Sequence, residues 1–180
     1  RSRFNKGKST EKINKPMSMY QTAVPQLNKM LHNLSVILKK AEDHAKAKEI
    51  EPKAFLESRL FPNMFNLIKQ IQIATDQVRH GCGRLAGIEL LKLEDDETSF
   101  EQLQNRIKLT IDYVNKIKPE QLNGTEEKDI SFSIREHKFD FKGHDYLLGW
   151  IIPNFYFHVM TAYNLLRHGG VEIGKRDYLG

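Results

Sequence analysis

Two polar side chains near the end of the chain have the spacing and chemistry of a ligand site. Asn154 and His158 lie four residues apart in a segment that is otherwise mainly apolar. Residues at this spacing share one face of a helix, and buried polar groups require hydrogen-bonding partners. Two interpretations follow: either His158 faces a ligand with Asn154 beside it, or His158 is a core histidine bonded to a neighbour.

The helix that positions this pair is predicted over about residues 145–168. Apolar residues cover most of its circumference, so we expect it to be the most buried helix. Pro153 has no backbone N–H; it therefore leaves the Gly149 carbonyl without its usual partner and should bend the helix just before Asn154. Trp150, one turn before Asn154, either packs in the core or lines the mouth of a pocket.

Three earlier helices are predicted from apolar residues that recur every three or four positions. They cover about residues 20–47, residues 63–79, and a stretch that begins at Thr98 and ends before Pro119. Thr98 and Glu101 have the spacing of a capping box, in which hydroxyl and carboxylate bond the first turn of a helix. Together with the last helix, these elements predict an all-α four-helix bundle.

The second of these helices adds another candidate to the site. Gln70 lies beside its inner apolar stripe, where its amide either belongs to the site or lies at a solvated edge. Gly81 and Gly83 are expected to end this helix. Cys82 between them is the single cysteine, which excludes an internal disulfide, and it is expected to be an inert thiol.

A change of period between the third and fourth helices predicts a small β-hairpin. Apolar and polar residues alternate over residues 130–134 and again over residues 138–142, around a turn at Arg135–Lys138. Two strands alone are marginally stable in water, so their apolar side must pack on the bundle.

The net charge of +5 comes entirely from the start of the chain. Residues 1–16 contain six Lys or Arg and one Glu, so the remainder is neutral by the same count. A nucleic-acid-binding domain carries positive charge on its folded surface, and no nucleic-acid partner is therefore expected. Residues 1–16 are interpreted as a disordered basic leader or tag, and residues 17–180 as a single domain. No apolar run approaches the roughly 18 residues that cross a bilayer, so we expect no membrane partner and a cytoplasmic protein.

Several longer motifs resemble those of one protein family. They are Met19–Tyr20, Ala41–His44, Arg59–Phe65, Gln70–Asp76, Pro153–His158 and Gly174–Gly180. From about residue 17 to the end, the chain is similar to the DinB/YfiT-like superfamily and, within it, to the domain-of-unknown-function family nineteen ninety-three. The resemblance implies a four-helix bundle, often dimeric in the superfamily, with no settled activity.

The resemblance also implies a metal site that this chain has in altered form. The superfamily often binds a divalent metal through three histidines, one from helix two and two, four residues apart, from helix four. Those positions correspond here to Gln70, with Gln72 as an alternative, Asn154 and His158. Neutral amides are poor ligands for zinc or nickel. We therefore expect no catalytic residue, no metal and no cofactor; a divalent metal, if one binds, would be held by His158.

These observations favour a non-catalytic protein that binds a small molecule or a partner and assembles as a homodimer. Its ligand site would contain His158, Asn154, Gln70 and Trp150. The alternative is an enzyme related to the metal- and thiol-dependent transferases of the superfamily, with His158 as its base or its sole strong ligand.

Overall fold

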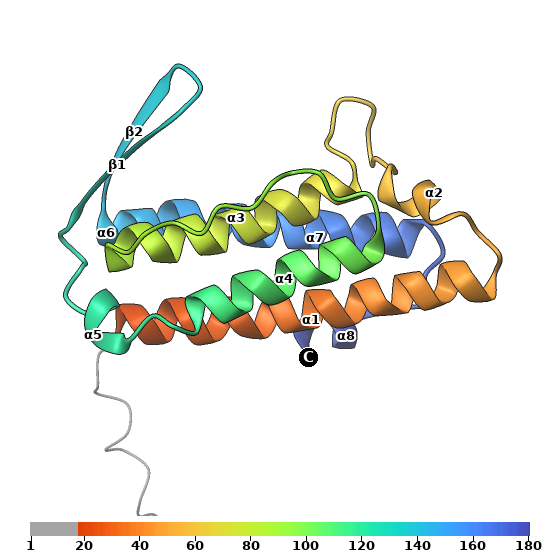
Figure 1. Cartoon of the computed structure of the whole chain (residues 1–180), viewed down its shortest axis with the longest axis horizontal. Helices are drawn as coiled ribbons and strands as arrows, with labels where there is room; N and C mark the ends of the chain where they lie inside the picture. Colours follow the sequence, from red (N-terminus) through yellow and green to blue (C-terminus); the bar gives the residue numbers. More distant parts are fainter. Residues whose placement is uncertain (1–17) are drawn as a thin grey trace, which may run out of the picture.

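Four long helices lie side by side in the computed structural model, which describes residues 18–180. In Figure 1, α1 and α4 form one layer and α3 and α7 form the other. α3 packs against both α7 and α4, and α1 packs against α4. The predicted leader at residues 1–16 lies outside the described residues. The long helices are α1 Met19–Ala47, α3 Leu67–Ala86, α4 Phe100–Val114 and α7 Ile152–His168.

Shorter elements complete the bundle. Strand β1, Asp129–Ile134, pairs antiparallel with β2, His137–Lys142, and the predicted four-helix bundle with one hairpin is confirmed. No helix within residues 18–180 is long and apolar enough to cross a membrane. The remaining elements are α2 Pro52–Leu56, α5 Pro119–Leu122, α6 Gly143–Asp145, the π-helical segment η1 Tyr146–Ile151, and α8 Lys175–Leu179.

The N-cap of α4 lies one residue later than predicted, at Ser99. The hydroxyl of Ser99 accepts a hydrogen bond from the backbone N–H of Gln102, and the side-chain oxygen of Gln102 accepts one from the backbone N–H of Thr98. The predicted pairing of Thr98 with Glu101 is wrong, because the hydroxyl of Ser99 caps the helix and Gln102 bonds the backbone of Thr98 instead.

The second predicted helix, α3, is longer than expected. It continues through Gly81 and Gly83 and ends before Gly87, whose φ of 67° lies in the left-handed region that favours glycine. A Cβ added to Gly81 would lie 2.6 Å from the Ile151 side chain, and one added to Gly83 would meet the hydroxyl of Tyr113. The predicted helix end at Gly81 and Gly83 is wrong, because these glycines allow close packing instead of ending the helix.

The hairpin packs its aromatic face on the start of the last long helix. Its side chains Phe132, Phe139 and Phe141 surround Trp150, with ring centroids 5.7, 4.8 and 5.6 Å away. The register places Phe132 opposite Phe139, so these cross-strand neighbours share one face. The tight turn passes through Arg135, whose φ is 54°. The hairpin thus gains from the bundle the burial that two strands alone lack.

The last long helix begins with a wide π-helical turn. Pro153 cannot donate a backbone hydrogen bond, and just before it the Ile152 N–H bonds the Leu147 carbonyl, five residues back. The side-chain amide of Asn154 donates to the Trp150 carbonyl at 2.7 Å. The interruption falls directly before Asn154, at the place where the proline was predicted to act.

Gly81→Ala is expected to lower the free energy of unfolding by about 1–3 kcal/mol, because the new methyl group must displace the side chain of Ile151. At an open helix position the same change would stabilise the protein by about 1 kcal/mol. Gly149→Ala is the matched control, since a Cβ there meets no atom within 4 Å. Urea unfolding followed by circular dichroism compares the three proteins, and a Gly81→Ala variant as stable as the wild type would contradict the packing explanation.

Candidate functional site

α3 and α7 bring two of the predicted site residues into direct contact. The side-chain oxygen of Gln70 and Nδ1 of His158 are 2.7 Å apart. Only 1% of Gln70 and 9% of His158 is exposed. Gln70 therefore lies in the interface between the two helices, facing His158, and not at a solvated edge.

The hydrogen-bond directions in this pair follow from a third group. Nε2 of Gln70 donates to the Phe65 carbonyl at 3.1 Å, which directs Oε1 of Gln70 toward His158. An amide oxygen can only accept, so Nδ1 of His158 carries the hydrogen. In the neutral ring, the other nitrogen, Nε2, therefore keeps its lone pair.

Burial keeps the imidazole of His158 uncharged. It lowers the pKa of His158 to about 4 from the ordinary value of 6.5. Among the described residues, the ring is hydrogen-bonded only to the neutral amide of Gln70, so no carboxylate opposes the effect of burial. At neutral pH, His158 is an uncharged hydrogen-bond acceptor and a weak base.

An exposed aromatic side chain lies against the ring of His158. Nε2 has no hydrogen-bond partner among residues 18–180, yet it still reaches solvent. The ring of Phe157 meets the imidazole at 90°, with centroids 5.2 Å apart. Phe157 is 57% exposed, and Phe65, whose carbonyl holds Gln70, is 49% exposed. This arrangement can accept one hydrogen bond from a largely apolar partner.

The other two predicted site residues have roles within the fold. Asn154 lies one turn before His158, but its amide N–H is used by the Trp150 carbonyl. The half-buried ring of Trp150 packs among the hairpin phenylalanines. The structure therefore brings Gln70 and His158 together, and it brings neither Asn154 nor Trp150 into hydrogen-bond contact with that pair.

These donors do not fit the three-histidine metal site that the family resemblance implies. The oxygen of Gln70 already accepts the Nδ1–H of His158, and the alternative position, Gln72, donates instead to Glu97 at 2.7 Å. Within residues 18–180, no three His, Cys, Asp or Glu side chains are grouped so that they could hold a metal ion. A single imidazole nitrogen remains where the superfamily has three.

A second polar cluster, which was not predicted from the sequence, joins α3 to α4. Arg106 of α4 is 2% exposed, and its Nε donates to the hydroxyl of Thr75 at 2.8 Å. Its terminal nitrogens bond the carboxylates of Asp76 and Glu97 at 2.6 and 2.8 Å. The signal in the sequence was the spacing of Arg106 from Leu103 and Thr110, three and four residues away on the inner side of the helix. A charged residue there must either reach solvent or find buried partners.

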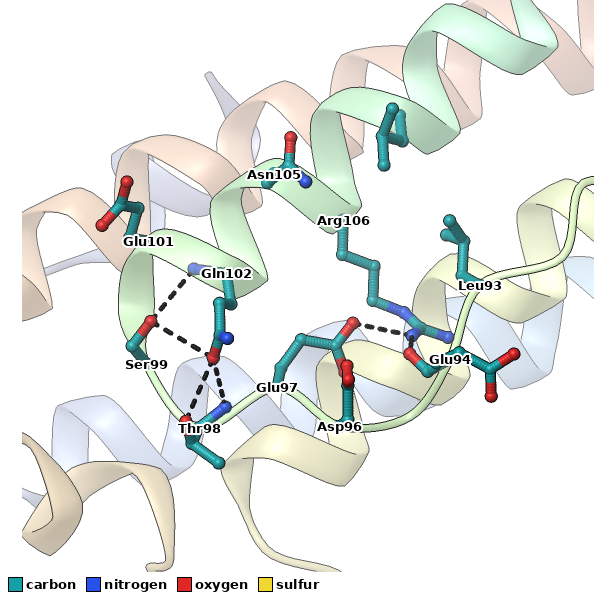
Figure 2. Close-up of a pocket in the computed structure, with 11 residues that line it drawn as sticks. Leu93, Glu94, Asp96, Glu97, Thr98, Ser99, Glu101, Gln102, Asn105 and Arg106 are labelled. Atoms are coloured by element: carbon teal, nitrogen blue, oxygen red, sulfur yellow. Dashed lines mark hydrogen bonds and ion pairs between the residues drawn. The ribbon is translucent and has the colours of Figure 1, made fainter.

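The same arginine fastens the long connection between α3 and α4. Figure 2 shows its side chain reaching from α4 to the backbone of Glu94 and the side chain of Glu97. Asp95 of the same connection lies 3.0 Å from the guanidinium. All five N–H donors of Arg106 are therefore used by protein groups.

A surface hollow of about 640 Å³ lies beside this cluster. Its rim is acidic, with Glu94, Asp96, Glu97 and Glu101 among the residues that line it. Because the guanidinium of Arg106 is fully bonded internally, the cluster is a network that holds the fold together.

The single cysteine is enclosed within α3. Burial raises the pKa of the Cys82 thiol to about 12. The thiol therefore stays protonated at neutral pH, which agrees with the inert thiol expected from the sequence.

Comparison with known proteins places the chain in a family. The model of a family described as domain of unknown function (DUF1993) matches residues 19–179. The chain belongs to the DUF1993 family. Among solved structures, it is similar to a crystal structure of a DinB family member from Shewanella denitrificans, with 38% identity and a TM-score of 0.81 over 89% of this chain and 91% of that one. No curated protein matches it. This DUF1993 protein therefore has the DinB-like bundle that the resemblance implied.

Acid is expected to destabilise this DUF1993 protein through His158. The unfolded chain takes up a proton near pH 6.5, whereas the folded imidazole, with its pKa of about 4, stays neutral. The unfolded state therefore binds more protons between these values, and stability is lost as the pH falls through this window. His158→Gln should reduce the loss of unfolding free energy between pH 7 and pH 5 by about 1–2 kcal/mol.

Urea unfolding at both pH values measures this difference. His168→Gln is the control, because His168 is exposed at the end of α7, and it should keep the pH dependence of the wild type. If His158→Gln also keeps that dependence, His158 is protonated equally in the folded and unfolded states.

Proposed function

We propose that this protein is a non-catalytic binding or interaction protein with a degenerate metal site, and that its binding site is the His158–Gln70 pair. The observation that carries the proposal is the direction of the hydrogen bonds through Gln70. Its amide fixes the tautomer of His158 and so presents Nε2 as an uncharged acceptor. The same amide oxygen, once bonded to His158, has less to offer a metal ion.

The surroundings of Nε2 support a ligand that is mostly apolar. Phe157 and Phe65 expose aromatic surface beside the pair, and no charged side chain is hydrogen-bonded to it. A small molecule with an apolar body and one N–H or O–H group would satisfy both the surface and the nitrogen. The neutral charge count of residues 17–180 supports a partner other than nucleic acid.

The second candidate function is a metal- or thiol-dependent transferase-like enzyme that uses His158. The free lone pair on Nε2 favours it, because a neutral imidazole with a fixed tautomer can act as a general base. The pKa of about 4 opposes it, since a general base works best with a pKa near the working pH. Because the pKa of His158 lies well below neutral pH, we prefer binding to catalysis as the proposal.

We also propose that the protein is a cytoplasmic homodimer. The homodimer is the assembly that the family resemblance implies. The lack of a helix within residues 18–180 that could cross a membrane is compatible with a cytoplasmic protein.

Metal analysis tests the degenerate site. We expect purified wild-type protein to contain no stoichiometric transition metal by elemental mass spectrometry. The double variant Gln70→His/Asn154→His restores three histidines and should bind zinc at least about 100-fold more tightly than the wild type, measured by calorimetry. The matched control is Gln72→His/Asn154→His, because Gln72 faces Glu97, and it should gain little. Stoichiometric metal in the wild type, lost in His158→Ala, would favour the enzyme instead.

A pair of matched probes tests the binding role. Phenol offers an aromatic ring with one O–H donor, and toluene offers a similar ring without it. Titration with phenol should shift the nitrogen-15 resonance of His158 Nε2, whereas toluene should not, because only phenol can donate to the lone pair. In His158→Ala, phenol binding should weaken by about 5-fold or more, the value of one neutral hydrogen bond. A core-histidine role would instead give a large loss of stability with no response to either probe.

A further inference from the structure

The outward side of η1 and α7 carries no charged side chain before the exposed Arg167 in the last turn of α7. Residues 146–166 contain no Asp, Glu, Lys or Arg. Several of these residues are nevertheless exposed, including the large apolar side chains of Leu148, Phe157 and Met160. Phe157 and Met160 are three residues apart on α7 and therefore lie on the same side of the helix.

Another helix of the bundle shows the contrast. α4, of similar length, exposes Glu101, Lys108 and Asp112. A helix that is apolar all round is normally covered by other structure, and a large exposed apolar patch on a soluble protein marks an interaction surface. The outward side of α7 therefore has the composition of an interaction surface that a partner covers.

Three more exposed apolar residues, Leu60, Phe61 and Phe65, lie in the connection between α2 and α3, which stands above the α3–α7 layer in Figure 1. Phe65 in this connection holds Gln70 beside His158. We name as the α7 face six apolar residues whose exposed fractions range from 38% to 61%: Leu60, Phe61, Phe65, Leu148, Phe157 and Met160.

The size of the α7 face suits a dimer contact. If a free large side chain offers about 200 Å², the six exposed fractions amount to roughly 600 Å² of apolar area. Each partner in a standard interface buries about 800 Å², of which about 65% is apolar in homodimers, or roughly 500 Å². The apolar area available is thus close to what a homodimer needs.

We propose that the α7 face is the contact surface of the homodimer and that the same face of a second copy covers it. This inference rests on the proposed homodimer and adds the surface through which it forms. In a two-fold dimer one patch meets itself, and a patch without charges does so without like-charge repulsion. Homodimer interfaces are also apolar and poor in charged residues at their centre.

A contact through this face would enclose the binding site. Phe157 packs directly against the ring of His158, so a partner that covers Phe157 also borders the free Nε2. The second copy would then supply another wall of the site. A ligand would be held between two chains, and the open surface beside His158 in one chain would become a closed pocket.

Analytical ultracentrifugation of the full chain tests the assignment. We expect a dimer for the wild type and, for Phe157→Glu, at least about 100-fold weaker association, because the new carboxylate would be buried unpaired. The matched control is Val36→Glu on α1, since Val36 is 53% exposed and lies outside the α7 face; it should remain dimeric. Circular dichroism confirms that each variant is folded.

Hydroxyl-radical labelling of the wild type makes the test independent of any variant. Phe157 and Met160 should become protected as the protein concentration rises, whereas Val36 and Leu109 should not. A dimer that survives Phe157→Glu and shows no protection of the α7 face would overturn this surface but leave the homodimer standing. A wild-type monomer would overturn both, and its sedimentation with phosphatidylcholine vesicles would assign the face to a lipid surface.

Discussion

Pro153 imposes the constraint on which the geometry of the candidate site depends. Because the proline has no N–H, the regular hydrogen-bond ladder of the last helix cannot continue through it. The chain opens instead into the π-helical turn η1, and the side chain of Asn154 satisfies the Trp150 carbonyl. Asn154 is thereby committed to the backbone, although the family resemblance implies a metal ligand at its position. A histidine at position 154 would have to be accommodated without that hydrogen bond. The asparagine therefore supplies a hydrogen bond at the place where the proline interrupts the backbone ladder.

The amide of Gln70 determines which ring nitrogen of His158 carries the hydrogen. One end of the amide is fixed by the Phe65 carbonyl, and the other end therefore presents an oxygen to the imidazole. Protein metal sites often use a carbonyl oxygen in this manner to orient a histidine ligand. Here the orienting group stands where another ligand would stand, so His158 keeps a directed lone pair but has no second imidazole beside it. Such a nitrogen suits the recognition of one hydrogen-bond donor.

The sequence predicted those features that depend on local pattern, and it failed where tertiary contact decides. The hairpin and the long helix α1 follow from period and composition, and both formed close to the predicted residues. Gly81 was misread as a helix end because a glycine at a helix contact and a glycine at a terminus look alike in one sequence. Gln70 could be placed beside an apolar stripe, but only the packing of α3 on α7 shows that it meets His158. Two partners of Arg106, Glu94 and Glu97, could not be predicted, since they lie in a connection with no periodicity.

The two sides of the bundle differ in how many of their polar and apolar groups have partners within the chain. Between α3 and α4, the five donors of one buried arginine meet carboxylates, a hydroxyl and a carbonyl, so no donor of the guanidinium is left for a ligand. On the α7 side the balance is reversed: charges are absent from residues 146–166, aromatic side chains are exposed, and one imidazole nitrogen lacks a partner among the described residues. Covering exposed apolar surface of this kind is favourable in free energy. The candidate site therefore belongs to the α7 side and not to the acidic hollow on the α4 side.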